Sequence, residues 1–135
     1  MTSCIELHDS TLYAAGVEES GFIIELRPAY VHRSEGEAGQ DAGSVFLQNF
    51  RIVVGDPVAS SRAYLLPARL GDGQIGVGDK LFTNTLPTAL QESGRVRIQL
   101  FVAGSDAPLD VAGSSISIQA LGEPRFLEVF PGCKR

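Results

Sequence analysis

The chain has 135 residues, of which 44% are hydrophobic and 20% charged, a composition typical of a single globular domain covering residues 1–135. The formal net charge is −5 and no run of Lys or Arg precedes the terminal Lys134-Arg135, which argues against nucleic-acid binding because phosphate contacts need clustered cations. The chain lacks a secretion signal and any apolar run long enough to span a bilayer, so we expect a cytoplasmic protein without membrane contact.

Alternation of apolar and polar residues predicts β-strands along most of the chain, because successive side chains of a strand point to opposite faces. The 15 glycines and 7 prolines favour many turns over long helices. In the first half of the chain, the predicted strands are residues 4–7, 12–17, 22–33 and 44–55.

Several residues of this first half lead to specific structural expectations. Pro28 cannot donate to a strand ladder, which predicts an edge position or a β-bulge. A regular strand would place Tyr30 and His32 on the same face as the apolar residues at positions 22, 24 and 26. Residues 34–43 are polar and rich in glycine, and we expect a flexible, disordered loop there. Gln48 falls on the face of two phenylalanines and needs a hydrogen-bond partner if it is buried.

The second half contains the clearest alternation, in residues 95–102 and 115–120, which predicts two neighbouring antiparallel strands. Residues 88–92 could form one helical turn, and residues 122–124 (Gly-Glu-Pro) are expected to turn the chain. The other predicted strands are residues 62–70, 74–82 and 125–130, with residues 109–111 as a small strand or a covering loop.

About nine or ten short strands at this spacing predict an all-β domain. We expect an antiparallel two-sheet β-sandwich, and a partly open β-barrel is the alternative. No fixed-period repeat and no linker divides the chain.

The two cysteines, Cys4 and Cys133, lie near opposite ends of the chain. The termini of a compact domain are often close, so a disulfide between them is geometrically feasible. Because no secretion signal is present, we expect two free thiols in a reducing cytoplasm.

The adjacent His8 and Asp9 are the most chemically suggestive pair, because a histidine beside a carboxylate can serve as a general base or hold a metal. His32 is the second of only two histidines, and a two-His-one-carboxylate site would need it to meet them. Adjacent residues of a strand point to opposite faces, so we expect Asp9 to cap the backbone of a turn and His8 to make a structural hydrogen bond. A ligand-binding site at His8, Asp9 and His32 is the alternative.

The chain shows no motif for catalysis. No serine lies in a G-x-S-x-G elbow. Residues 71–76 match G-x-G-x-x-G, but no helix or βαβ unit is expected after them, so the match indicates a hairpin turn. We therefore predict no catalytic residue, no cofactor, no bound metal and no enzyme activity.

Phe101 is an apolar residue in the polar register of its predicted strand, flanked by Arg97 and Gln99. Such a residue is either covered by a loop or buried in a partner interface. These three residues are the candidate interface, and a homodimer through this face is one prediction.

Residues 5–12 (Ile-Glu-Leu-His-Asp-Ser-Thr-Leu) and 116–128 resemble short patches of small bacterial all-β proteins that begin with a Leu-His-Asp-Ser/Ala motif. Some of these are grouped with immunity proteins of the Imm50 kind. The resemblance implies a bacterial β-domain that binds and blocks a toxin, and it transfers no catalytic residue. An acidic chain suits a basic toxin, since complementary charge speeds association. A non-enzymatic protein-binding domain is the leading prediction; a small-molecule or metal-binding domain and a structural homo-oligomer are the alternatives.

Overall fold

The computed structural model describes residues 1–59 and 64–133, and its regular structure is entirely β. The described strands pair antiparallel, which confirms the all-β prediction; the choice between sandwich and partly open barrel stays a prediction. No helix in the described part of the chain has the length and apolar character needed to cross a membrane. The strands are β1 (Thr2–Glu6), β2 (Thr11–Glu18), β3 (Gly21–Ser34), β4 (Gly43–Gly55), β5 (Val58–Ala59), β6 (Ala68–Val77), β7 (Lys80–Thr83), β8 (Thr85–Pro87), β9 (Leu90–Val102) and β10 (Leu109–Phe130).

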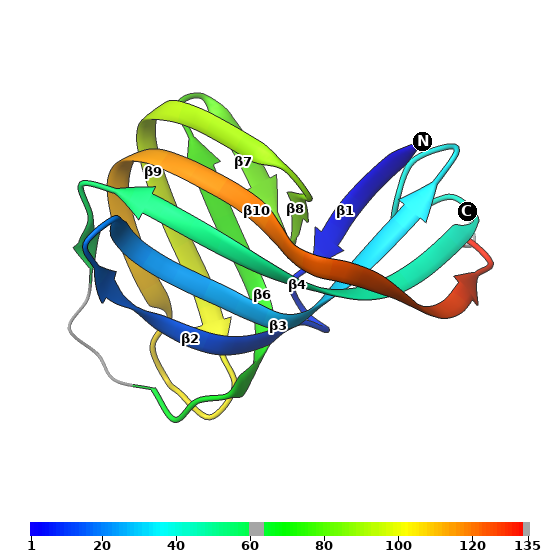
Figure 1. Cartoon of the computed structure of the whole chain (residues 1–135), viewed down its shortest axis with the longest axis horizontal. Coiled ribbons are helices and arrows are strands. Elements are labelled where there is room, and N and C mark those ends of the chain that lie inside the picture. Colours follow the sequence, from blue (N-terminus) through cyan, green and yellow to red (C-terminus); the bar gives the residue numbers. More distant parts are fainter. Residues whose placement is uncertain (60–63, 134–135) are drawn as a thin grey trace.

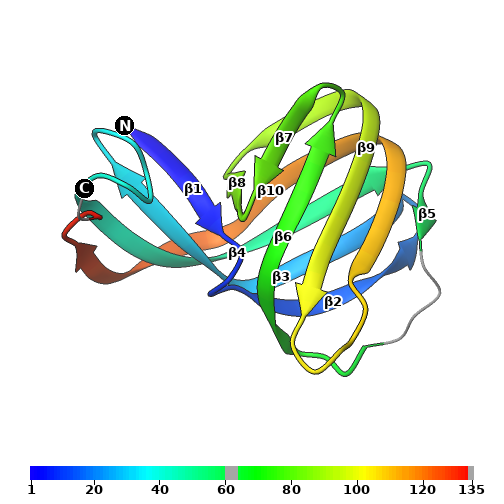
Figure 2. The ribbon, with the colours of Figure 1, turned by 180° about the vertical axis from the view of Figure 1, so that it is seen from behind.

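Six strands form a ring, which we call the body (Figure 1). The order is β2-β6-β9-β10-β4-β3, and β2 also pairs with β3 to complete the ring. β4, β6 and β9 alternate apolar side chains into the ring with more exposed residues outside it, whereas β3 is buried throughout residues 21–26. Figure 2 shows β6 and β9 side by side across this body. The largest fully buried side chains of the body are Leu12, Ile24, Leu26, Phe50, Ile52, Ile75, Ile98, Leu100 and Leu109.

Three strands of the body extend beyond it and form a second region, which we call the arm (Figures 1 and 2). The arm consists of residues 29–34 of β3, 43–48 of β4 and 125–130 of β10, together with β1 and the loop of residues 35–42. β1 pairs with β3 on one side and with the short β8 on the other. Both termini lie at the arm (Figure 1).

A β-bulge at Pro28 marks the point where β3 leaves the body. The pairing with β4 shifts between Leu26, opposite Phe50, and Ala29, opposite Gln48. The predicted bulge is therefore confirmed. Because the bulge adds a residue, Ala29 continues the inner face, and the expected placement of Tyr30 and His32 on that face was wrong.

A second irregularity occurs where β10 leaves the body. The expected turn at residues 122–124 is wrong, because β10 continues through it and bulges between Leu121, opposite Asn49, and Arg125, opposite Leu47. The side-chain amide of Gln48 donates to the carbonyl oxygen of Gly122 at 3.0 Å. Gln48 thus has the hydrogen-bond partner that its burial requires, and this bond spans the bulge.

The loop of residues 35–42 also differs from expectation. In place of disorder, the loop has its own hydrogen bonds: the amide of Glu37 donates to Oδ2 of Asp41 at 2.7 Å, and the amide of Asp41 donates to the carbonyl of Glu37 at 2.8 Å. Such local bonds stabilise a polar segment that lacks an apolar anchor.

The remaining differences concern short elements. No helical turn occurs at residues 88–92, where β9 begins at Leu90. The short strands β5 and β8 were not predicted. The expected strand at residues 62–70 begins at Ala68 in the structure, and its residues 62–63 lie outside the described part of the chain. The hairpin turn expected at residues 71–76 is wrong, because β6 continues through them to Val77 and bulges between Leu70 and Gly73.

Candidate functional site

The structure gives His8, Asp9 and His32 different surroundings. Oδ1 of Asp9 accepts a hydrogen bond from Arg69 at 3.2 Å. Nε2 of His32 lies 2.8 Å from Oε2 of Glu6, whereas His8 is exposed. Among residues 1–59 and 64–133, no group of three His, Cys, Asp or Glu side chains is arranged to hold a metal ion. None of these contacts joins His8, Asp9 and His32 to one another, and the ligand-binding site stays a prediction.

His32 is packed within the outer face of the arm. Its ring contacts Phe130 edge-on, with centroids 4.8 Å apart, and Tyr30, with centroids 5.4 Å apart. The Tyr30 hydroxyl donates to Oε1 of Glu128 at 2.7 Å. Burial raises the pKa of the Tyr30 phenol above its usual range, and the nearby Glu128 carboxylate raises it further. The proton of this hydrogen bond therefore stays on the tyrosine. The cluster joins β3 to the end of β10 across β4.

Two of the three residues of the predicted interface on β9 form hydrogen bonds to the neighbouring strand β10. Arg97 donates to both carboxylate oxygens of Asp110, at 3.3 and 3.1 Å, and Gln99 lies 3.4 Å from the same carboxylate. Phe101 remains 55% exposed. The interface stays a prediction, and Phe101 is the one exposed apolar side chain among its three residues.

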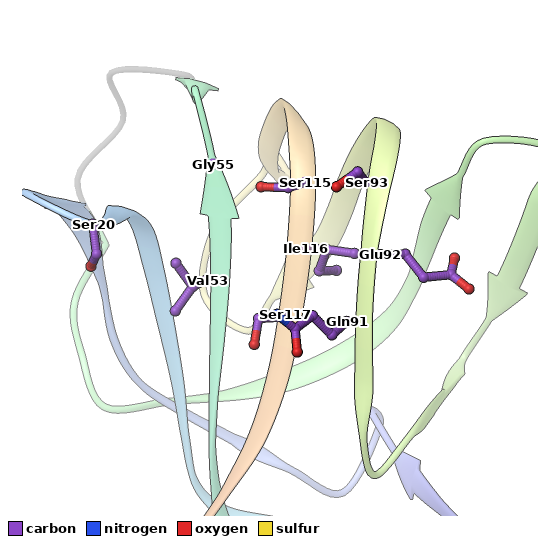
Figure 3. A pocket seen from close by; sticks show the side chains of 9 residues that line it. All are labelled: Ser20, Val53, Gly55, Gln91, Glu92, Ser93, Ser115, Ile116 and Ser117. Carbon is purple, nitrogen blue, oxygen red and sulfur yellow. The ribbon is translucent and has the colours of Figure 1, made fainter.

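A groove of about 350 Å³ lies on the outside of the body across β4, β10 and β9 (Figure 3). It is hollow because Ser93, Ser115 and Ser117 are small, and a Cβ at Gly55 would collide with Oγ of Ser115. Its carboxylate, Glu92, is already paired with Lys80. The nine lining residues include no histidine, cysteine or aromatic ring, so the groove offers no nucleophile–base pair and no stacking platform.

Large apolar side chains are exposed together at the end of β10. Phe126 is 61% exposed, Leu127 47% and Val129 71%. Phe126 and Val129 lie opposite Phe46 and Ser44 of β4, and the rings of Phe46 and Phe126 contact each other with centroids 5.8 Å apart. We call Phe46, Phe126, Leu127 and Val129 the arm patch.

The surroundings of the arm patch leave it open. A hollow of about 240 Å³ lies beside it, bordered by Met1, Arg33 and Phe46. The Arg33 guanidinium stacks 4.7 Å from the centre of the Phe46 ring. On its side away from β4, β10 pairs with β9 only as far as Ile118, and no described strand pairs there with residues 121–130. The patch therefore combines exposed apolar side chains with an unpaired strand edge.

Sequence reasoning missed this patch. The residues were predicted as a terminal strand, and a terminal strand on a domain is expected to bury one face. The available signal was the pairing of adjacent apolar residues, Phe126 with Leu127 and Val129 with Phe130, because a strand with one wet face alternates instead.

Comparison with known proteins identifies no relative: no protein-family model, curated protein or solved structure matches the chain.

Proposed function

We propose that this chain is a non-enzymatic protein-binding domain and that the arm patch is its contact surface. The observation that supports this proposal is the exposure of Phe126, Leu127 and Val129 in one short stretch. Monomeric soluble proteins rarely expose large contiguous apolar patches, whereas single exposed apolar residues such as Phe101 are ordinary. Aromatic side chains, phenylalanine included, are also enriched in protein interfaces.

The immunity role implied by the resemblance is the particular form of this function that we propose. In that form the partner is a toxin, and binding blocks it. The net charge of −5 favours a basic partner, because opposite charges accelerate association. The bacterial origin and cytoplasmic location belong to the same proposal.

The test compares three baits in lysate of the source cells. Both termini lie at the arm, so each bait is anchored from the body through a cysteine introduced at the exposed Val58, in a Cys133→Ser background. We expect a basic protein to be retained by the parent bait and by a Phe101→Ser bait. A Phe126→Ser/Val129→Ser bait should retain it about tenfold less or worse, since two exposed contact residues are lost.

Two results would count against the proposal. One is that no bait retains a protein. The other is that retention is lost with Phe101→Ser and kept with Phe126→Ser/Val129→Ser, which would move the contact surface to β9. An unchanged urea midpoint for each bait excludes unfolding as the cause.

A homodimer through Phe101, Arg97 and Gln99 is a second proposal, supported by the 55% exposure of Phe101. Light scattering at micromolar concentration should then give twice the monomer mass, reduced to the monomer by Phe101→Ser. A monomer in the parent protein contradicts it.

A further inference from the structure

The two cysteines come from opposite ends of the chain and contact the same loop. The thiol of Cys4, in β1, donates to the carbonyl oxygen of Ala38 with an Sγ–O distance of 3.6 Å. The thiol of Cys133, just after β10, donates to the carbonyl oxygen of Gly39 at 3.5 Å. Consecutive Cα atoms are about 3.8 Å apart, so these carbonyls are neighbours. The two thiols therefore flank one short piece of the loop, although 128 residues separate them in sequence (residues 5–132).

His32 lies beside Cys4 on the neighbouring strand and has a ring nitrogen without a hydrogen-bond partner among the described residues. His32 is the direct cross-strand partner of Cys4, so their side chains lie on the same face of neighbouring strands. Glu6 holds Nε2 of His32 at 2.8 Å, and an N–H donated there leaves Nδ1 as an acceptor. Nδ1 is buried, and no described residue gives it a hydrogen bond.

The segment that carries Cys133 follows the end of β10 and lies outside the sheet. Residues 131–133 belong to no strand, and Cys133 bonds to the loop through its amide, which donates to the carbonyl of Gln40 at 2.8 Å, and through its thiol. Cys133 is exposed. Gly39 has a φ of +83°, and a Cβ there would contact Sγ of Cys4 at 3.6 Å. The glycine at this position therefore keeps a side chain away from the Cys4 sulfur.

We propose that Cys4 and Cys133 form a thiol–disulfide exchange site, which a small disulfide such as glutathione disulfide oxidises to an intramolecular Cys4–Cys133 disulfide. The exposed Cys133 thiolate attacks one sulfur of glutathione disulfide, which forms a mixed disulfide and releases one glutathione thiolate. Cys4 then gives its proton to Nδ1 of His32 and attacks the Cys133 sulfur, which releases the second glutathione. Two protein thiols are oxidised and one glutathione disulfide is reduced to two thiols.

The order of these steps follows from the two environments. Burial, followed by Glu6 and Glu37, raises the pKa of the Cys4 thiol to about 11, so Cys4 is a poor first nucleophile. The mixed disulfide therefore forms at Cys133, and Cys4 resolves it.

The disulfide would tie together the two sides of the arm. Cys4 lies in β1 at one side of the arm sheet, and Cys133 follows β10 at the other side. The cross-link would also hold the loop of residues 35–42 between them. Because it closes almost the whole chain into a loop, it would restrict the unfolded state strongly and raise the unfolding temperature.

The test uses the full chain, reduced and then incubated with glutathione disulfide. After an acid quench, intact mass should show a loss of about 2 Da, for two hydrogens, as the main product. The Cys4→Ser variant, which cannot resolve the mixed disulfide, should instead gain about 305 Da for one glutathione. The Cys133→Ser variant should remain largely unmodified over the same time. Oxidised protein should be cleaved more slowly than reduced protein by a glutamate-specific protease at Glu35 and Glu37.

Three outcomes would overturn the proposal. They are a stable mixed disulfide on the parent protein, a dimer linked through two copies of Cys133, and no reaction at all. Peptide mapping of the parent protein identifies the bonded cysteines directly, so the result does not depend on the folding of Cys4→Ser. Failure of this test leaves the arm patch proposal standing, because neither cysteine belongs to that patch.

Discussion

The body and the arm are built from the same three strands, yet they bury their side chains very differently. In the body, β3, β4 and β10 are joined by β2, β6 and β9, and inward residues such as Phe50 and Ile98 are at most 1% exposed. β2, β6 and β9 do not pair with the described residues of the arm, where Phe126 and Val129 are more than half exposed. Exposure in the arm is concentrated at the end of β10, because Ala29, Val31 and Val45 of β3 and β4 are fully buried.

The boundary between the two regions lies at the two bulges. β3 shifts register between Leu26 and Ala29, and β10 shifts between Leu121 and Arg125. Bulges bend a strand and increase its twist, which allows the strands to leave the ring together. Gln48 lies between the bulges and bonds to Gly122, so one side chain connects the two irregular strands.

The largest effect should come from removing a body core side chain. Phe50→Ala should lower the free energy of unfolding by about 3–5 kcal/mol, because the ring cannot close over the cavity that remains. Urea unfolding of the two proteins measures the difference. A loss below about 1 kcal/mol would show that the body is not packed as described.

A smaller effect is expected for the ion pairs on the outside of the body. Glu25 accepts from Arg51 at 2.9 Å and from Arg27 at 2.9 Å, and Glu25→Gln should cost about 1–3 kcal/mol at pH 7. The Arg51 bond, and then the Arg27 charge, hold the pKa of the Glu25 carboxyl below its usual range.

The pH dependence of this effect has a definite sign. A lowered pKa in the folded state stabilises the protein above the ordinary glutamate pKa of about 4.3, and the stabilisation is lost as the pH falls below it. The difference between parent and Glu25→Gln should therefore be largest at neutral pH and shrink in acid. Unfolding curves between neutral pH and pH ~3 measure it; a difference that grows in acid would contradict the assigned ion pairs.

At the boundary, Gln48→Ala should cost about 1 kcal/mol, because it removes the hydrogen bond between Gln48 and the carbonyl oxygen of Gly122. We also expect faster amide exchange in the arm than in the body of this variant. Hydrogen exchange resolved by region makes the measurement, with Gln119→Ala at an exposed site of β10 as the matched control. Equal acceleration in both regions would mean that Gln48 does not separate them.

The smallest effect on stability should come from the arm patch itself. Phe126→Ser should change the free energy of unfolding by less than about 0.5 kcal/mol, since the side chain is already exposed. The contrast with Phe50→Ala compares one aromatic residue in each region in the same urea experiment. A loss as large as that of Phe50→Ala would show that the arm patch is part of the core.

The local alternation of residues was sufficient to predict much of the fold. Residues 95–102 and 115–120 do lie in adjacent antiparallel strands, Pro28 lies at a bulge, and Gln48 has a partner. Each of these follows from side-chain direction along a strand or from the missing amide hydrogen of proline, which are properties of a few neighbouring residues.

The consequences of strand pairing, in contrast, depend on the tertiary structure. The bulge at Pro28 reversed the faces of Tyr30 and His32, and the continuation of β10 through residues 122–124 produced the arm. The neighbours of His32 and of the two cysteines likewise come from segments far apart in the chain. Local periodicity in the sequence sets where strands form, whereas the cover over an apolar face depends on which distant strands pair and pack beside it.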